Sequence, residues 1–333
     1  MEDGRLARPN QPARLPSVTI QLHGMRKAAL LYNPLSGRRR HRRLSVIESV
    51  LAIFRNGGVE ARATATLSRG EAGEQARQAI ASGCDTIVAC GGDGTVHDVL
   101  QGVVGTAAAL AVIPLGTANA LAHDLRIPLS PLRSAEAALQ GKSRRVAVGR
   151  IDYNDLRGNR AQRYFTVAAG IGVDAHLFYA LDPQHKHRLG MAAYYAKATQ
   201  LWLTHSMERF AVDFSQDGTS CHAEVSELLA VRIQNFGGVL RELAPGASLD
   251  RNDLRLVLFH TTSRFRYLSY IQRGLLGARW EIPGIDLVHS DRVSCALLPA
   301  APGSIYVEAD GELLGTLPAE ISTLPDALTL LAP

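Results

Sequence analysis

The sequence predicts an α/β protein of two domains, an N-terminal three-layer domain built on a parallel sheet and a C-terminal antiparallel β-sandwich. Three observations lead to this fold class. The 333 residues suffice for two domains of about 150 residues each. From residue 27 to about residue 145, continuous apolar segments alternate with helical patterns, as expected for a parallel sheet covered on both faces. Shorter apolar or alternating segments bounded by Gly, Asp, Asn or Pro follow, which is typical of an antiparallel sandwich.

The N-terminal α/β domain is expected at residues 26–145. Strands are predicted at 27–34, 59–66, 85–90 and 110–116, and helices at 41–58, 70–83 and 95–105. Ligands of parallel sheets bind beyond the carboxyl ends of the strands, so the segments that follow those ends are the candidates for a site.

The C-terminal domain is expected at residues 146–312, with the closing segment 313–333 packing back on the first domain. Helices are predicted at 190–205 and 264–278, among strands at 145–154, 163–172, 209–218, 228–236, 254–261, 292–299, 304–312 and 327–333. Residues 1–25 are rich in Pro and Arg and lack the apolar core of a signal peptide, so we expect a disordered tail.

Composition sets limits on function. The 36 Lys and Arg against 31 Asp and Glu give a net charge of +5, which suits an anionic ligand or membrane surface but is too small to indicate nucleic acid. The 4 cysteines form no C-x-x-C pair, which disfavours a zinc site or a disulfide framework. No apolar stretch reaches the roughly 20 residues of a transmembrane helix.

The segment GGDGT, residues 91–95, predicts a phosphate-binding loop. It follows the apolar run DTIVAC and precedes a helical pattern. Glycines let backbone amides approach phosphate oxygens, and a helix N-terminus favours an anion. Asp93 repels phosphate, so it is expected to hold Mg²⁺ or to orient the loop. The alternative is a glycine-rich turn in which Asp93 only caps the helix.

Six segments together resemble the diacylglycerol kinase catalytic family, in the bacterial branch of lipid kinases related to sphingosine and ceramide kinases. They are LLYNPLSGR (30–38), TLSRGEA (66–72), GGDGTVHDVLQG (91–102), IPLGTANALA (113–122), AGIGVDA (169–175) and EADGELLG (308–315). The resemblance implies an N-terminal domain like that of NAD kinase and phosphofructokinase. It also implies ATP-dependent phosphorylation of a lipid hydroxyl in the cleft between the domains.

The resemblance also assigns nucleotide-binding residues. It places the nucleotide against Asn33 and Thr66 at two strand ends, and against the loop Gly91, Gly92, Asp93, Gly94 and Thr95. Thr117 belongs to a second loop that faces the first. The family usually has Asp where this chain has Ala120, so one orienting carboxylate is missing.

The catalytic acids are expected in the segment DGE, together with Asp93 of the glycine loop, which is expected to help place the γ-phosphate. Phosphoryl transfer needs charge neutralisation, alignment and a carboxylate that receives the hydroxyl proton. The resemblance places Asp310 and Glu312 at the cleft, and either is a candidate base, with a slight preference for Glu312. Without the resemblance, DGE is typical of a solvated hairpin turn.

Metal binding is the least determined part of the site. Mg²⁺ is expected with ATP. Many bacterial members of the family carry a DDG turn that holds a structural Mg²⁺. In this chain Arg251 and Asn252 replace the second Asp and the Gly of that turn. Because Mg²⁺ takes oxygen ligands, an arginine at a ligand position argues against the ion. Ala147 stands where the family often has an Asp, so Asp152 or Asp174 is expected to substitute for it, or turnover is expected to be low.

Three functions stay open at this point: a lipid kinase, an NAD kinase-like phosphotransferase and a catalytically weak nucleotide- or lipid-binding homologue. Diacylglycerol-like, sphingoid, ceramide and polyprenol acceptors are all compatible with the motifs. We expect a cytoplasmic protein in peripheral contact with the inner face of the membrane, without nucleic acid and with a possible homodimer. The basic segment 37–43 either meets ATP phosphates or an acidic bilayer surface or is a solvated basic face. In the segment 185–190, the resemblance makes His187 and Arg188 candidate phosphate contacts. The helix at 264–280 either faces lipid or packs on the sandwich.

Overall fold

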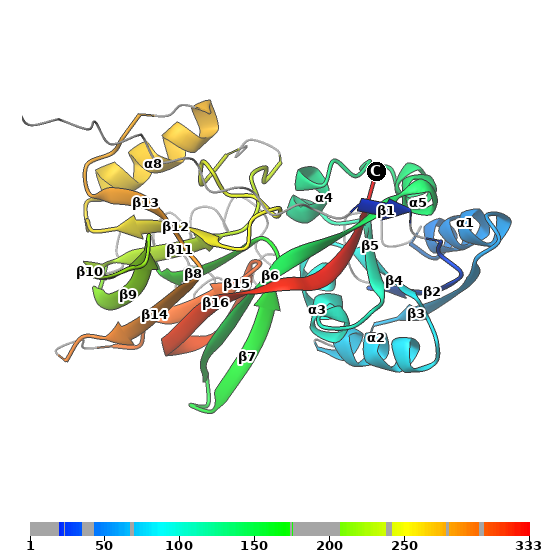
Figure 1. The fold of residues 1–333 in the computed structure, drawn as a ribbon, viewed down its shortest axis with the longest axis horizontal. Coiled ribbons are helices and arrows are strands. Elements are labelled where there is room, and N and C mark those ends of the chain that lie inside the picture. Colours follow the sequence, from blue (N-terminus) through cyan, green and yellow to red (C-terminus); the bar gives the residue numbers. More distant parts are fainter. Residues whose placement is uncertain are drawn as a thin grey trace, which may run out of the picture.

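The computed structural model confirms the predicted fold class, a parallel α/β domain beside an antiparallel β-sandwich (Figure 1). It describes residues 20–22, 24–34, 43–66, 70–173, 175, 207–237, 242–277, 280–299 and 303–333. Most of the tail, the helix predicted at 190–205, Asp174, and the basic residues at 38–42 and 185–190 lie outside the described residues.

The N-terminal sheet has parallel strands in the order β3 (Glu60–Ala65), β2 (Lys27–Tyr32), β4 (Thr86–Gly91) and β5 (Ala109–Pro114). Every residue of β4 and β5 is buried, which explains their continuous apolar sequences. All four carboxyl ends therefore lie at one edge of the sheet, where the segments 33–34, 66, 91–95 and 115–119 begin.

Helices cover both faces of this sheet. α1 (Arg43–Asn56) and α5 (Pro131–Gln140) pack on one core, and α2 (Glu71–Ala81) and α3 (Asp93–Val103) pack on the other. The short α4 (Ala120–Asp124) follows the loop after β5. α2 and α3 touch through Gly73 and Gly102, where a Cβ on Gly102 would lie 2.0 Å from the Gly73 carbonyl oxygen.

The C-terminal domain is a sandwich whose two sheets share the strand β16 (Glu312–Ala332). One sheet contains β13 (Ile285–Ser290), β12 (Leu254–Phe259), β11 (Glu227–Val231), β8 (Ala168–Gly172), β15 (Tyr306–Ala309) and the start of β16. The other contains β10 (Thr219–Val225), β9 (Phe210–Gln216), β14 (Arg292–Leu297), the middle of β16, β6 (Lys142–Asp155) and β7 (Arg160–Phe165). Their facing apolar side chains form one core, and α8 (Arg264–Leu276) covers the outer face of the first sheet (Figure 1).

Two long strands join the domains. β6 pairs with β16 from Lys142 to Asp155, and the end of β16 pairs in parallel with β5 through Thr329 and Leu330. The short β1 (Ile20–Leu22) adds to the start of β6. The closing segment of the chain thus lies in the sheet of the first domain, and the first residues of the same strand lie in the second domain.

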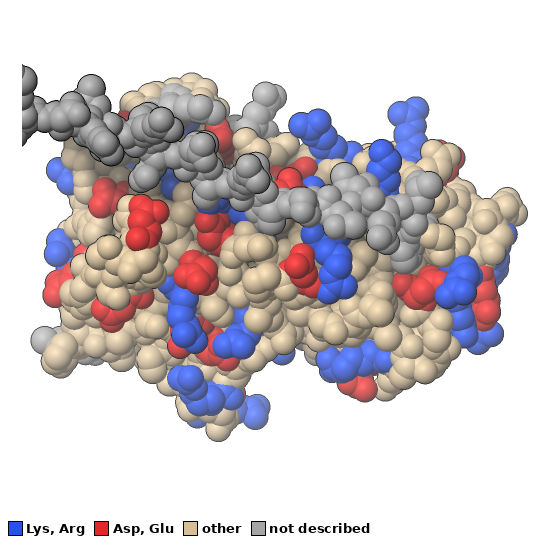
Figure 2. Space-filling model, viewed as in Figure 1, with Lys and Arg blue, Asp and Glu red and all other residues tan. Residues whose placement is uncertain are grey.

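Charged side chains of both signs intersperse over the face that Figure 2 shows, without a large region of one sign among the described residues. None of the helices within the described ranges is long and apolar enough to span a bilayer.

Candidate functional site

The GGDGT loop leaves the buried strand β4 and turns directly into α3. Gly91 must be glycine because a Cβ there would lie 2.2 Å from Oγ1 of Thr95, whose side chain is buried beneath the loop. The amides of Thr95 and Val96 donate to the carbonyl of Gly92, at 2.9 and 3.1 Å, and begin the helix. The loop therefore exposes main chain at the N-terminus of an 11-residue helix, the arrangement that suits a phosphate.

A second loop, residues 115–119, packs backbone to backbone against the first. A Cβ on Gly116 would lie 2.4 Å from the Cα of Gly92, so neither loop has room for a side chain at this contact. Asn119 closes the second loop, accepting from the Gly116 amide at 2.9 Å and donating to the Gly116 carbonyl at 3.1 Å. Thr117 is exposed at the tip.

Asp93 links the two loops. Its carboxylate accepts hydrogen bonds from the backbone amides of Asn119 at 2.9 Å and Ala120 at 2.7 Å. Burial raises the pKa of Asp93, and these two hydrogen bonds only partly offset the effect. Asp93 was expected either to hold Mg²⁺ or to orient the loop. Its hydrogen bonds to the second loop are those of an orienting residue. Ala120 has no side-chain carboxylate, but its backbone amide is hydrogen-bonded to Asp93.

Asp310 lies in the tight turn between β15 and β16 and is almost entirely buried. Asp310 and Gly311 both have positive φ, 50° and 81°, as a two-residue hairpin of the primed type requires. The carboxylate accepts from the amides of Thr166, Val167 and Ala168 at 3.1, 2.9 and 3.2 Å. It is thus an acceptor for the backbone between β7 and β8, not the solvated turn residue that DGE in isolation suggests.

Asp310 also reaches the helix of the phosphate loop. Nδ1 of His97, on α3, lies 3.3 Å from Oδ2 of Asp310, and each side chain is only 3% exposed. The charge of Asp310 further raises the pKa of Asp93. Sequence reasoning missed His97. Its signal was a position four residues after Asp93, one turn further along the same helix face.

Glu312, the first residue of β16, extends over the phosphate loop. Its Oε1 would lie 2.8 Å from a Cβ built on Gly94, so the carboxylate occupies the space that the glycine leaves. Two segments more than 200 residues apart in the sequence therefore meet at this edge of the parallel sheet. Gln101 of α3 adds another contact between the domains, to Tyr164 of β7. Its side chain donates to the Tyr164 carbonyl at 2.9 Å and accepts from the Tyr164 amide at 3.0 Å.

Asn33 and Thr66 lie at the neighbouring strand ends. Thr66 is buried, and its amide and hydroxyl both donate to the Tyr32 carbonyl, at 2.9 and 3.4 Å. Asn33 directly follows Tyr32 at the end of β2. Both predicted nucleotide residues therefore share the sheet edge with Gly91–Thr95.

Of the two acids expected to substitute for the one missing at Ala147, the structure describes Asp152, whereas Asp174 lies outside the described residues. Ala147 is buried in β6, and Asp152 pairs with Arg150 at 2.9 Å.

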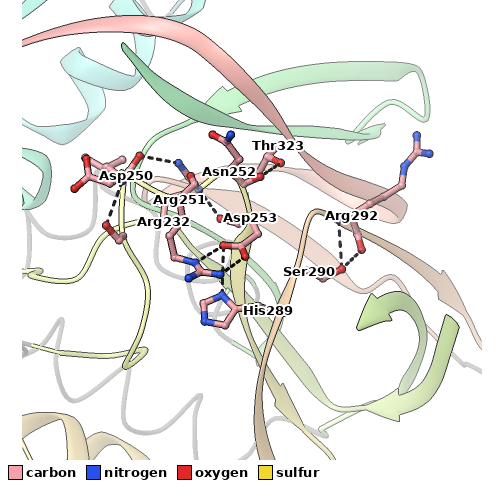
Figure 3. A network of polar contacts seen from close by, with 11 residues as sticks. Arg232, Asp250, Arg251, Asn252, Asp253, His289, Ser290, Arg292 and Thr323 are labelled. Carbon is pink, nitrogen blue, oxygen red and sulfur yellow. Dashed lines mark hydrogen bonds and ion pairs between the residues drawn. The ribbon is translucent and has the colours of Figure 1, made fainter. Parts of the chain in front are cut away.

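The turn at residues 249–253 is held by a buried arginine (Figure 3). Arg232, at 0% exposure, donates to the carbonyls of Arg251 and Asp253 through Nη1, and to those of Ala147 at 2.9 Å and Leu249 at 3.4 Å through Nη2. Burial lowers the pKa of Arg232 to about 10, so the guanidinium is charged at neutral pH. One cation thus fastens the turn to the strand β6 that joins the domains.

This donor set does not fit a structural Mg²⁺. Asp250 pairs with Arg144 at 2.9 Å, and Asp253 accepts from Arg251 and lies 3.4 Å from His289 (Figure 3). The turn carbonyls receive N–H groups, whereas Mg²⁺ requires oxygen ligands with free lone pairs. Within the described ranges, no group of three or more His, Cys, Asp or Glu side chains could hold a metal.

Comparisons with known proteins match both parts of the chain. Residues 27–151 match the diacylglycerol kinase catalytic domain, and residues 167–332 match the YegS C-terminal NAD kinase beta sandwich-like domain. The chain therefore contains a diacylglycerol kinase catalytic domain, followed by a YegS-type sandwich domain. A protein named diacylglycerol kinase from Bacillus subtilis is 29% identical over 90% of this chain and 94% of its own length. One from Staphylococcus carnosus is 24% identical over 92% and 95%.

Solved structures show the same fold. A putative diacylglycerol kinase from Bacillus anthracis superposes with a TM-score of 0.72 at 21% identity, covering 94% of this chain and 99% of that one. Yeast NADH kinase in complex with NADH gives 0.53 at 11% identity, covering 96% and 88%. The predicted relation of the fold to NAD kinase is therefore confirmed.

Proposed function

We propose that this protein is an ATP-dependent lipid kinase whose acceptor is the hydroxyl of a diacylglycerol-like lipid. The observation that carries the proposal is the meeting of Glu312 with the glycine loop at Gly94. It brings a carboxylate next to main chain suited to phosphate. The names of the relatives support a kinase acting on diacylglycerol.

In this proposal Glu312 is the general base. Its carboxylate receives the proton of the lipid hydroxyl as the hydroxyl oxygen bonds to the γ-phosphorus and the bond to the bridging oxygen of ADP breaks. Asp310 is less suited to that role because four hydrogen-bonding groups already surround its buried carboxylate. Asp310 and His97 instead position the turn that carries Glu312.

The nucleotide would lie along the edge where the parallel strands end. The amides at the start of α3 and the loop of Thr117 would hold its phosphates, with Asn33 and Thr66 towards the adenosine. Mg²⁺ accompanying ATP would neutralise phosphate charge. Asp93 keeps the two loops together through its bonds to the second loop.

Label transfer tests the proposal directly. The protein is incubated with γ-labelled ATP and, separately, diacylglycerol, a sphingoid base, ceramide, a polyprenol and NAD, and products are identified by mass. The expected result is phosphorylated diacylglycerol. Phosphorylation of NAD alone would contradict the lipid assignment.

A second candidate is a nucleotide- and lipid-binding homologue with very low turnover. It is favoured by Ala147, whose methyl group replaces the family's common acid, and by the pairing of Asp152 with Arg150. ATP binding measured by calorimetry, without transfer of label to any lipid above, would favour this candidate over the kinase.

A further inference from the structure

A cavity of about 1040 Å³ lies in the second domain, between α8 and the edge of the first sheet of the sandwich. Arg273 of α8, Arg255 of β12, the loop at 242–246 and the segment 280–288 contribute to its lining. In the order of the sheet, β12 and β13 stand three and four strands from β15, whose turn leads to Glu312 (Figure 1). At about 4.8 Å between neighbouring strands, the cavity lies about 14 Å or more across the sheet from that turn. It is therefore separate from the site described above.

Two guanidinium groups line this cavity without a counter-ion. Arg273 is only 5% exposed, and its Nη2 has no hydrogen-bond partner. Nε of Arg255 is buried and lacks a partner as well. Among the described residues, neither guanidinium pairs with a carboxylate. Burying an unpaired cation is costly, and such a group in a native fold calls for a bound ion as its explanation.

The packing around the cavity holds both guanidinium groups in place. That of Arg273 lies 4.4 Å from the centre of the Tyr270 ring, and the Tyr270 hydroxyl donates to the Leu243 carbonyl at 2.5 Å. Gly246 packs against the other group, since a Cβ built there would lie 3.6 Å from Nε of Arg255. Because the cations are already positioned, a ligand would bind them with little loss of side-chain entropy.

A third guanidinium approaches the same cavity. Arg266 lies seven residues before Arg273, on the same side of α8. A Cβ built on Gly284, which lines the cavity, would lie 2.8 Å from Nη1 of Arg266. Burial lowers the pKa of Arg255, and the charges of Arg251 and Arg273 lower it further. The cations thus repel one another, and an anion between them would relieve the repulsion.

The acids around the cavity leave this positive charge uncompensated. Three carboxylates line it, those of Glu242, Glu281 and Asp286. Asp286 pairs with His260 at 3.1 Å, and Glu281 is exposed to solvent. The charge of Asp253 also reaches Arg255, but this carboxylate already accepts hydrogen bonds from Arg251.

The charge and the size of the cavity select the class of ligand. A phosphate monoester carries a charge of about −1.5 to −2 at neutral pH and three acceptor oxygens, whereas a carboxylate brings a single charge. The planar fork of arginine matches phosphate oxygens in pairs. The volume is that of a site for a small organic molecule, so it has room for more than the phosphate itself. Gln216, Gln234 and Trp280 line it and provide two amides and an aromatic ring.

We propose that this cavity binds a phosphate monoester. The phosphate lies between Arg255 and Arg273, and the organic part of the ligand lies towards Gln216, Gln234 and Trp280. The inference goes beyond the proposed function and does not depend on it, because it concerns a second phosphate site away from the glycine loop.

Fluorescence of Trp280 tests the proposal at the cavity itself. The chain has 2 tryptophans, Trp202 and Trp280, so Trp202→Phe leaves one that lines the cavity. This protein is titrated at constant ionic strength with glycerol 3-phosphate, inorganic phosphate, a short-chain phosphatidate and acetate. The expected result is a saturable change with the phosphate compounds and at least tenfold weaker binding of acetate. A signal that saturates with none of the phosphates, or equal affinity for acetate, would overturn the proposal.

Arginine variants assign the binding to the two guanidinium groups. In the same background, Arg255→Gln and Arg273→Gln should each weaken phosphate binding at least tenfold. Arg133→Gln, exposed on α5, is the matched control and should keep the affinity. Without phosphate, Arg255→Gln should unfold at or above the temperature of its parent, because it removes a cation that has no counter-ion. Unchanged affinity in Arg255→Gln would overturn the proposal even if Arg273→Gln fails to fold.

Two further comparisons identify the source of the ligand and the origin of the signal. Glycerol 3-phosphate and phosphatidate carry the same phosphate monoester, so tighter binding of the first indicates a soluble ligand and tighter binding of the second a lipid. Gly116→Ala alters the loop that faces the glycine loop, and it should leave the Trp280 response unchanged. A response lost in Gly116→Ala would trace the signal to the glycine loop and contradict a second site.

Discussion

Replacing Arg232 by methionine removes the cation that holds the turn 249–253 while nearly preserving the volume. The guanidinium contacts four backbone carbonyls, those of Arg251, Asp253, Ala147 and Leu249. Each buried carbonyl left without a hydrogen-bond donor lowers the stability of the fold by about 1–3 kcal/mol, and structural relaxation or an entering water molecule recovers part of this loss. We therefore expect Arg232→Met to lower the free energy of unfolding by about 3–5 kcal/mol, the range for losing one member of a buried charge network.

Thermal unfolding measures this effect. At about 2–4 °C per kcal/mol for a domain of this size, the variant should unfold about 10 °C below the wild type. Arg232→Lys should lie between the two, because a single ammonium group cannot reach all the carbonyls that the planar guanidinium reaches. Arg255→Met is the matched control, since Arg255 pairs with Val231 across β11 and β12 and its Nε lacks a hydrogen-bond partner.

Divalent cations provide the second part of the test. If Arg232 takes the place of a metal, neither EDTA nor millimolar Mg²⁺ should shift the unfolding temperature of the wild type in the absence of nucleotide. A variant within about 1 kcal/mol of the wild type, or a wild type that EDTA destabilises, would refute the reasoning.

Three further changes test other parts of the site. Gly116→Ala places a Cβ 2.4 Å from the Cα of Gly92 and should weaken ATP binding, measured by calorimetry, at least tenfold. Gly24→Ala is the control, because nothing lies within 4 Å of a Cβ at that position, and it should leave the affinity unchanged. Equal ATP affinities of the two variants would contradict the loop packing. Burial would raise the pKa of Asp253, but hydrogen bonds from Arg251 and the His289 ring 3.4 Å away hold it well below the usual value, so its stabilising effect is present above about pH 4 and is lost as the pH falls further. Asp253→Asn should therefore flatten the acid limb of the stability curve, and an unchanged slope would count against this pairing. Asp310→Asn presents an amide to backbone N–H groups and should cost about 1–3 kcal/mol in unfolding free energy and reduce kcat, so a variant with both unchanged would remove its positioning role.

Local patterns in the sequence predicted the first domain well. Every residue of β4 and β5 is buried, because helices cover both faces of the parallel sheet, and this burial explains why their sequences are continuously apolar. Glycines of the phosphate loop were equally readable, because their lack of a side chain is required by close contacts with Thr95 and Glu312.

The strand β16 could not be read from the sequence. Its 21 residues contain Pro318 and Pro325, which are typical of breaks between strands. Near both prolines the register with β6 shifts, between Thr316 and Glu320 and between Leu324 and Leu328, and these irregularities accommodate residues without an N–H. One strand could then pass through both sheets of the sandwich and into the first domain.

Long-range polar contacts were also out of reach of the sequence. The approach of His97 to Asp310 depends on how two domains pack, and Arg232 acts on a turn that begins 17 residues later in the chain. The helix at 264–278 was expected either to face lipid or to pack on the sandwich. Its buried side packs through Tyr267 and Tyr270, and the outward apolar side leaves the lipid alternative open to experiment.

The central claim, that Glu312 is the base for phosphoryl transfer to a lipid hydroxyl, is tested most directly by the turnover of Glu312→Gln. The variant keeps the size of the side chain but cannot accept the proton. We predict that its kcat for diacylglycerol falls at least a hundredfold while its affinity for ATP and its unfolding temperature stay within error of the wild type. Glu320→Gln, on the same strand and paired with Arg292, should keep wild-type turnover. Wild-type kcat in Glu312→Gln would contradict the account.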